Sequence, residues 1–376
     1  MKTIKYFFFV VLCVVLTSCK EKDLPDENFI DFANMIVQQL VFDDATPAIN
    51  AFDYDEFEKR ILANMNLSSE EKKQASDFIR KAENPITSLL ESVRNGADVR
   101  FIKFYRKDTE PHIIFRTYSN GMISMADWTL GVKKGEVRVF DAFLVELGIY
   151  WSDDYRQRLY NHLQIYTDEV INTNKLIETN YLISKGEYQQ ADSLLYWLMP
   201  QMQDNLYART MELRLASFDK EYDDVQAVAE QFDKSFPQHK ATSAYHLMQS
   251  AIEQGVVDEV IKHIYTLIDQ LGDDPIYYLY QAWAFQSSNS FKFAAEYLDS
   301  AMCYIPSNIG LYLNKMDIYY YDSEYENCVN LLYHIDSLFA RSDNDVLFFS
   351  KSYPLLKEYK PFIEWTEGRK QLTINN

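Results

Sequence analysis

The sequence is poor in glycine and in positive charge. Its 376 residues include 10 glycines, whereas an average usage near 7% would give about 26. This shortage disfavours glycine-rich phosphate loops and turn-dense all-β folds, and it favours helices. Lysine and arginine together number 37 against 56 aspartate and glutamate residues, which gives a net charge of −19. Because an acidic surface repels phosphate backbones, we expect no nucleic-acid partner.

The common catalytic signatures are also missing from the sequence. It contains no GxGxxG, no phosphate-binding loop, no HExxH, no GxSxG and no CxxC motif. Its six histidines are scattered, with no two at ligand spacing on one helix face, and this disfavours a metal site. We therefore expect a protein without enzyme activity and without a metal or cofactor.

The N-terminus has the parts of a secretory signal. Lys2 and Lys5 precede an apolar run over residues 7–16, which is too short to cross a hydrocarbon core of about 30 Å. The sequence Leu16-Thr17-Ser18-Cys19 follows and resembles the lipobox of bacterial lipoproteins. That resemblance implies removal of residues 1–18, lipidation of Cys19 and anchoring in the cell outer membrane. The alternative is an ordinary secretory signal with an incidental cysteine.

The residues after the signal indicate a tether and two free thiols. Residues 19–28 are polar and charged with one proline, so they predict a short tether. Apart from the signal segment, the cysteines are Cys303 and Cys328, both in apolar company on predicted helices. We expect two buried thiols there rather than a disulfide.

Residues 29–150 predict an α+β domain. Helices are expected over 29–42 and 53–65, the first capped by Asn28, and a third begins at the capping box Ser68 to Glu71. Alternating patterns then predict a four-stranded antiparallel sheet with strands near 99–106, 112–118, 122–130 and 137–147. Asn120-Gly121 and Lys134-Gly135 indicate tight hairpins. The element order loosely resembles the cystatin-like or nuclear-transport-factor-like cone. A connecting helix over 151–171, capped by Ser152, leads into the second half.

The second half carries a repeat of about 34 residues. Four columns recur in register: an aromatic or branched position, a small position three residues later, and apolar positions four and seven residues after that. The columns are Tyr188, Tyr222, Val257, Phe291, Tyr325; Ala191, Val225, Val260, Ala294, Cys328; Leu195, Ala229, Ile264, Leu298, Leu332; and Leu198, Phe232, Leu267, Ala301, Ile335.

These columns resemble the tetratricopeptide repeat, a helix-turn-helix unit. The resemblance implies an α-α superhelical solenoid of five units over 172–342, at 172–205, 206–239, 241–274, 275–308 and 309–342, with a cap over 343–376. The alternative is an unrelated helical bundle with coincidental spacing.

The resemblance implies a concave face, lined by the first helix of each unit, that binds a partner. Helix phase places seven candidates on it: Arg214, Tyr245, Gln249, Trp283, Gln286, Asp317 and Tyr320. Aromatic, amide and arginine side chains suit an extended peptide or a partner helix, and the rings also suit a sugar. The bland alternative is that the two largest rings, Trp283 and Tyr320, only pack between repeats.

The sheet holds one polar cluster. Strand alternation places Asp141 in an apolar row with Val137, Val139, Phe143 and Val145, where a carboxylate needs a partner or an upward pKa shift. His112 and Arg116 share a face with Asp127, and Arg116 and Asp127 are expected to form an ion pair. His112, Arg116, Asp127 and Asp141 would line the mouth of a cone and bind a small polar ligand, or they would only stabilise the sheet.

The sequence as a whole predicts a lipid-anchored envelope protein that acts as a non-catalytic interaction scaffold. The expected partner is another envelope protein or a peptide segment, and contact with the membrane is expected through the lipid alone. Two alternatives remain open: a surface lipoprotein that binds glycans or oligosaccharides, and a domain that binds or turns over a small molecule in the cone.

Overall fold

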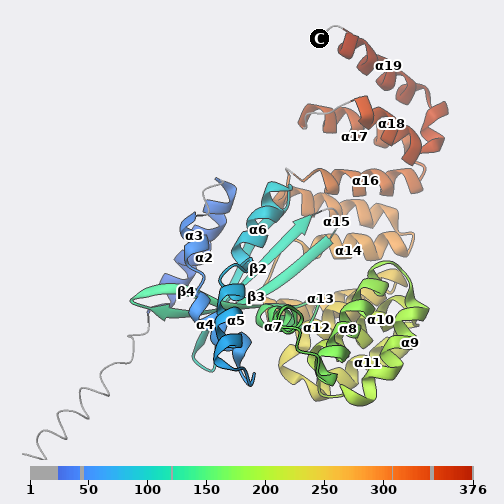
Figure 1. Cartoon of the computed structure of the whole chain (residues 1–376). Coiled ribbons are helices and arrows are strands. Elements are labelled where there is room, and N and C mark those ends of the chain that lie inside the picture. The colour runs from blue at the N-terminus through green and yellow to red at the C-terminus, as the bar shows by residue number, and fades with distance from the viewer. Residues whose placement is uncertain (1–23, 43–45, 120–121, 307, 339–342, 375–376) are drawn as a thin grey trace, which may run out of the picture.

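Figure 1 shows the computed structural model, which describes residues 24–42, 46–119, 122–306, 308–338 and 343–374. The signal segment with Cys19, residues 19–23 of the predicted tether and the Asn120-Gly121 turn lie outside the described residues.

Within the described residues, five helices precede the sheet. They are α2 (Asp26–Val41), α3 (Thr46–Asn50), α4 (Tyr54–Leu62), α5 (Ser69–Ile79) and α6 (Pro85–Arg94). The capping box of α5 is present, with the Ser68 hydroxyl accepting from the Glu71 amide and the Glu71 carboxylate accepting from the Ser68 amide. Two expectations are corrected. Helix α2 begins at Asp26 rather than after Asn28, and α3 and α6 were not predicted.

The sheet has five strands rather than four. They are β1 (Asp98–Lys107), β2 (Glu110–Ser119), β3 (Met122–Lys133), β4 (Glu136–Leu144) and the two-residue β5 (Ile149–Tyr150), antiparallel and adjacent in chain order. The expected hairpin at Lys134-Gly135 is confirmed, because Lys133 pairs with Glu136 and both turn residues have positive φ, 56° and 78°.

A bulge in β4 corrects the predicted row around Asp141. Thr129 pairs with Asp141 but the next residue, Leu130, pairs with Val139, so Phe140 is the extra residue. Its ring covers Gly131, where a Cβ would lie 2.0 Å from a ring carbon. The bulge reverses the alternation of the strand. Val139 therefore packs with the N-terminal helices, whereas Phe143 and Val145 pack with the C-terminal ones.

The expected connecting helix is two helices. Helix α7 (Trp151–His162) ends nine residues before the predicted end at residue 171, and α8 (Asp168–Ser184) starts with Thr167 as its N-cap. Ser152 does not cap α7. It lies inside the helix, and its hydroxyl donates to the Asp141 carboxylate.

The second half consists of packed helix pairs. The pairs are α8 with α9 (Tyr188–Leu198), α10 (Leu206–Asp219) with α11 (Tyr222–Ser235), α12 (Lys240–Glu253) with α13 (Val257–Leu271), α14 (Tyr277–Ser287) with α15 (Phe291–Tyr304), and α16 (Ile309–Tyr321) with α17 (Tyr325–Leu338). Each second helix starts at a residue of the predicted aromatic column. The residues of the other three columns are all buried, at 3% exposure or less.

The chain ends in a helical cap over α17. It comprises α18 (Asp343–Ser352), the short 3-10 helix η3 (Pro354–Glu358) and α19 (Lys360–Ile374). Phe349, Leu356 and Trp365 pack with Met316 and Cys328. Of the two thiols expected to be buried, Cys328 is buried but Cys303 is exposed.

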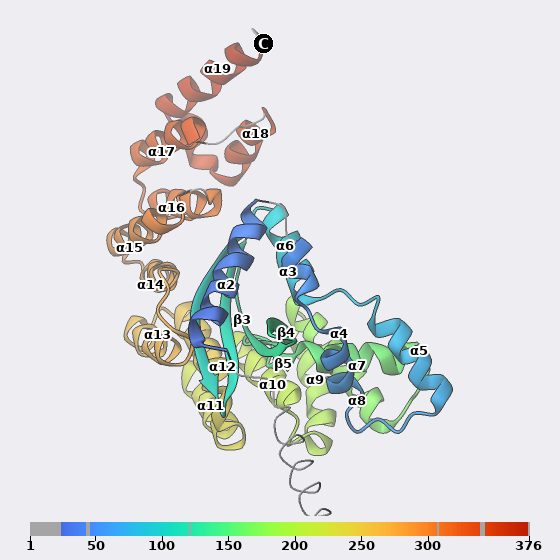
Figure 2. The same ribbon diagram turned by 90° about the vertical axis from the view of Figure 1, so that its left-hand side faces the viewer.

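The sheet lies between two layers of helices, as Figures 1 and 2 show from two directions. Ile113, Phe115 and Trp128 pack into the core of the N-terminal helices. On the opposite face, residues such as Ile114 and Met125 share a core with α12 to α16. Both faces of the sheet therefore contribute residues to a core shared with helices.

The first helices of three pairs touch the sheet or the turn at its edge. At α10, a Cβ added to Gly148 would lie 2.0 Å from the Thr210 hydroxyl. At α12, the His246 ring nitrogen Nε2 lies 3.1 Å from the Glu146 carbonyl. At α16, the Asn314 amide donates to the Tyr118 hydroxyl at 3.4 Å. The contact thus extends across several helix pairs.

Candidate functional site

The seven residues expected on a concave face lie on α10, α12, α14 and α16, and all are partly buried. Tyr245 and Trp283 pack against the core that the sheet shares with the helices. Gln249 and Gln286 lie on the same two helices. The sheet of the same chain thus covers the helix face on which Tyr245 and Trp283 lie.

Arg214 lies at the edge of this contact. Its guanidinium donates to the Asn180 side chain of α8. Burial lowers the Arg214 pKa from its usual value, while the nearby Glu146 and Tyr245 oppose the shift. The Arg214 side chain is thus held within the molecule.

Asp317 and Tyr320 point to the cap instead. The Tyr353 hydroxyl donates to the Asp317 carboxylate at 2.7 Å, and burial raises the Asp317 pKa. The Tyr320 hydroxyl accepts from the Leu355 amide at 3.3 Å. The structure therefore does not bring the seven predicted groove residues together.

Two of the four predicted polar-cluster residues lie together. The His112 nitrogen Nδ1 is 3.0 Å from one Asp127 oxygen, and the Tyr105 hydroxyl donates to the other at 2.5 Å. Tyr105 and His112 pair across β1 and β2, and their rings stack at 5.0 Å. Each Asp127 oxygen thus has a partner. His112 makes this contact through Nδ1, and its other ring nitrogen, Nε2, takes no part in it.

The predicted ion pair between Arg116 and Asp127 is wrong. Arg116 is 1% exposed and pairs with the Asp98 carboxylate and, at 3.5 Å, with the Asp274 carboxylate. Asp274 lies between α13 and α14 and is also 1% exposed. The sequence pattern could not indicate Asp274 as a partner, because Asp274 belongs to the second half of the chain.

Asp141 has a structural set of partners. One carboxylate oxygen accepts from the Ala142 amide at 2.9 Å and the Ser152 amide at 3.0 Å, and the other accepts from the Ser152 hydroxyl at 2.5 Å. Burial raises the Asp141 pKa to about 6 although these hydrogen bonds oppose the shift. Asp141 therefore ties β4 to α7, and it does not join His112 and Asp127.

A cleft of about 240 Å³ lies where the sheet meets the helices, and we name it the interface cleft. Strands β1 to β4 contribute Tyr105, Lys107, His112, Asp127 and Phe143, and the strand ends add Val145 and Tyr150. The helical side contributes Gln238, His239, Ala241, Thr242, Gln270 and Leu271. His112 and Asp127 thus lie in a cleft, whereas Arg116 and Asp141 are not among its lining residues.

His239 forms part of the aromatic wall of this cleft. Its ring centre lies 4.6 Å from that of Phe143 and 6.4 Å from that of Tyr150. Burial lowers the His239 pKa to about 4, and the positive charge of Lys107 lowers it further. His239 is therefore neutral at pH 7 and has one donor and one acceptor nitrogen.

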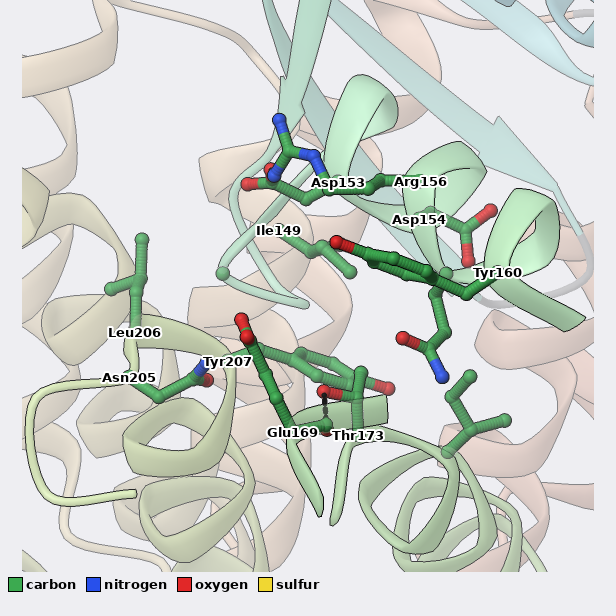
Figure 3. Close-up of a pocket in the computed structure, with 13 residues that line it drawn as sticks. Ile149, Asp153, Asp154, Arg156, Tyr160, Glu169, Thr173, Asn205, Leu206 and Tyr207 are labelled. Carbon is green, nitrogen blue, oxygen red and sulfur yellow. Dashed lines mark hydrogen bonds and ion pairs between the residues drawn. The ribbon is translucent and has the colours of Figure 1, made fainter. Parts of the chain in front are cut away.

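A second cleft of about 250 Å³ lies between α7, α8 and the start of α10 (Figure 3). Asp153 and Arg156 lie together at its rim and form an ion pair, and Glu169 and Thr173 of α8 line the opposite side. Burial raises the Tyr207 pKa to about 12. Three of the charged residues that line this cleft, Asp153, Asp154 and Arg156, form ion pairs within the chain, so the cleft gives a weaker argument for a ligand.

Five rings form a row on α14 and α15 that was not predicted. We name this row the aromatic strip: Tyr304, Tyr278, Tyr297, Phe285 and Phe293, in spatial order. Three of them are exposed, whereas Phe285 and Tyr297 are partly buried against the core. Successive ring centres lie 6.4, 6.4, 5.2 and 5.5 Å apart. Tyr304 is 58% exposed and Phe293 is 53% exposed.

The sequence did contain a signal for this strip. Phe293, Tyr297 and Tyr304 are spaced four and seven residues apart, and Tyr278 and Phe285 seven apart, so each set lies on one face of a helix. These positions lie outside the repeat columns. Aromatic residues at helical spacing outside the columns were therefore the clue.

Searches of the molecule and of known proteins add three negative findings. Among the described residues, no group of three or more histidine, cysteine or acidic residues could hold a metal ion. Within the same part of the chain, no helix has the length and apolar character needed to cross a membrane. No model of a known protein family matches the sequence, and neither does any curated protein.

Proposed function

We propose that this protein is a lipid-anchored scaffold of the bacterial cell envelope that binds another envelope protein without catalysis. In this proposal, Cys19 carries the lipid in the outer membrane and the helical half is a tetratricopeptide-like solenoid. The aromatic strip, rather than a concave groove, contacts the partner.

The repeat assignment rests on the agreement of columns and helices. Residues at the 34-residue spacing begin the second helix of each pair, and the small column lies at helix crossings with 0% exposure throughout. Small side chains at these positions let two helices approach closely. Both features are what a tetratricopeptide-like unit requires.

The aromatic strip is the observation that carries the proposed binding function. Exposed apolar residues scattered singly need no explanation, but a continuous row of rings is typical of an interaction surface. Tyrosine is also enriched among the residues that dominate binding energy at protein interfaces. The net charge of −19 favours a partner whose contacting surface is basic.

Glycan binding is the second candidate, because rings also stack on sugars. Two contacts in the strip weigh against it. Phe285 and Tyr297 stack with 13° between their planes, and Tyr278 and Tyr304 with 17°. Ring faces that are turned toward each other are not available to a sugar, whereas ring edges suit protein side chains.

Affinity capture from detergent-solubilised envelope tests the binding proposal. We expect one protein to be recovered with the unaltered chain and lost with Phe293→Ala and with Tyr304→Ala. Tyr265→Ala is the matched control, since Tyr265 lies on α13 and is 68% exposed. Equal recovery with all variants would exclude the strip, and recovery of an oligosaccharide in place of a protein would favour the glycan candidate.

Lipid anchoring has its own test. We expect Cys19→Ala to prevent incorporation of a labelled fatty acid and to shift the protein from the membrane to the soluble fraction. Cys303→Ala serves as the control, because Cys303 is an exposed thiol outside the lipobox. Membrane retention of unlabelled Cys19→Ala protein would contradict the anchor.

A further inference from the structure

We infer that the interface cleft binds a small organic monocarboxylate, with the carboxylate at Lys107 and the apolar part of the ligand against Phe143, Val145 and Leu271. This site is separate from the aromatic strip and does not depend on the proposed function.

The charges of the cleft favour an anion. Lys107 and Asp127 are its two charged lining residues. The Asp127 oxygens already accept from Tyr105 and contact the His112 nitrogen, so this carboxylate is compensated within the chain. The ammonium of Lys107, by contrast, has no ion pair in the part of the chain that the structure describes. A ligand carboxylate would supply one.

Hydrogen-bonding groups at the cleft are left without partners. His112 Nε2 and Thr242 Oγ1 are both buried and lack a hydrogen bond within the described residues. Their residues are 7% and 0% exposed, and both line the cleft. Buried polar atoms of this kind call for a water or a ligand. The Thr242 hydroxyl can donate to a ligand oxygen. His112 donates from Nδ1 to Asp127, so Nε2 of the neutral ring is an acceptor, and it lies 3.8 Å from the Glu110 carboxylate.

The rest of the lining favours an apolar body on the ligand. Phe143 and Val145 come from the sheet, and Ala241 and Leu271 from the helices. A cavity of about 150 Å³ is enough to hold benzene, so the interface cleft, at about 240 Å³, has room for a ring or short alkyl chain with a carboxylate. A polar end and an apolar wall are the usual features of a small-molecule site.

Calorimetry with three probes of one shape tests the ligand class. Benzoate, benzamide and benzylamine differ mainly in the charge of the group on the ring. We expect benzoate to bind about tenfold more tightly than benzamide, and benzylamine not to bind. Tighter binding of benzamide or benzylamine would overturn the inference. Hexanoate is added as a carboxylate with an alkyl chain. If neither benzoate nor hexanoate bound at millimolar concentration, the inference would also be overturned.

Variants locate the binding. Lys107→Gln should remove the preference for benzoate over benzamide, whereas Lys72→Gln, an exposed lysine on α5, should keep it. Ala241→Leu should fill the cleft and weaken benzoate binding at least tenfold in a chain that melts normally. If benzoate bound to Lys107→Gln and to Ala241→Leu as tightly as to the unaltered chain, its site would lie elsewhere and the inference would fail. Loss of the envelope partner in Phe293→Ala would not affect these results.

Discussion

Individual buried charges fix the position of the sheet against the helices. Arg116 of β2 and Asp274 of the second half are each 1% exposed, and their charged groups lie 3.5 Å apart. Burial raises the Asp274 pKa, and the positive charge of Arg116 opposes that rise. Removing Arg116 would leave the buried Asp274 carboxylate with only the partly exposed Arg100, 3.9 Å away, to compensate its charge.

Arg116→Met should therefore destabilise the protein strongly. We expect a loss of about 3–5 kcal/mol in the free energy of unfolding, measured by urea denaturation. Arg80→Met is the control, because Arg80 pairs with Asp55 at 2.7 Å but both side chains are more than half exposed. An exposed pair contributes about 1 kcal/mol or less. Equal losses in the two variants would show that the Arg116 pair is not structural.

Asp141 gives a prediction about pH. Its pKa is about 6 in the folded chain against the ordinary 3.8, so folding favours the protonated acid. Below pH 3.8 this group contributes ~3 kcal/mol to the free energy of unfolding, and that contribution is lost as pH rises through 6. Asp141→Asn has no such dependence. The difference in unfolding free energy between the unaltered chain and this variant should fall from pH 4 to pH 7. A constant difference would contradict the assignment.

For individual residues, the sequence predicted that a buried charged group needs a partner, but it did not predict which residue the partner is. It indicated that Asp141 requires a partner, and the structure supplies two amides and a hydroxyl. It placed Arg116 beside Asp127 from strand register alone. That register is correct, since Arg116 pairs with Met125 and Ile114 with Asp127. Arg116 pairs instead with Asp98 of β1 and with Asp274, which is about 160 residues away in sequence and approaches from the helices.

Among the elements, turns and repeat columns were predictable and irregular strands were not. The hairpin at Lys134-Gly135 and the starts of the five second helices follow from local residue type. The bulge at Phe140 depends on Gly131 of the neighbouring strand, which makes room for the ring. Strict alternation cannot include such an extra residue, so the predicted row around Asp141 failed there.

The turn between β4 and β5 gives a prediction at the scale of elements. Gly148 has φ of +60°, and a Cβ there would meet the Thr210 hydroxyl of α10. Gly148→Ala should lower the free energy of unfolding by about 2–3 kcal/mol, from backbone strain and overpacking. Gly186→Ala is the control, since its φ is +75° with open space around it, and it should cost about 1 kcal/mol. Thermal melts compare the two, and equal losses would contradict close packing at Thr210.

For the whole molecule, the main feature is a sheet that is covered on both faces by helices of its own chain. The sequence predicted both halves but not their contact. A repeat pattern specifies packing between neighbouring helices, and it carries no information about what lies on the remaining helix face. The residues expected in an open groove are accordingly divided between the sheet contact, at Tyr245 and Trp283, and the cap, at Asp317 and Tyr320.

This contact should weaken in acid. His246 of α12 is 2% exposed beside the Glu146 carbonyl. Burial lowers its pKa from 6.5 to about 3, and the charge of Arg214 contributes. The contribution of neutral His246 to the free energy of unfolding is therefore fully present above pH 6.5. It declines as pH falls toward 3, and the loss is ~3 kcal/mol at pH 4.

His246→Gln keeps a donor for the Glu146 carbonyl and does not titrate. Its unfolding free energy should decline less between pH 7 and pH 4 than that of the unaltered chain. His162→Gln provides a control on α7, away from this contact. Identical declines in the unaltered chain and His246→Gln would contradict the role of His246.

The central claim is that an anchored protein holds a partner at the aromatic strip. Photo-crosslinking in living cells tests it most directly, with a benzophenone amino acid placed at Phe293, at Tyr304 or at Tyr265. We predict that light produces the same crosslinked protein from both strip positions and not from Tyr265, and that Cys19→Ala reduces its yield. Absence of a crosslinked protein at both strip positions, or an equal yield at Tyr265, would contradict the claim.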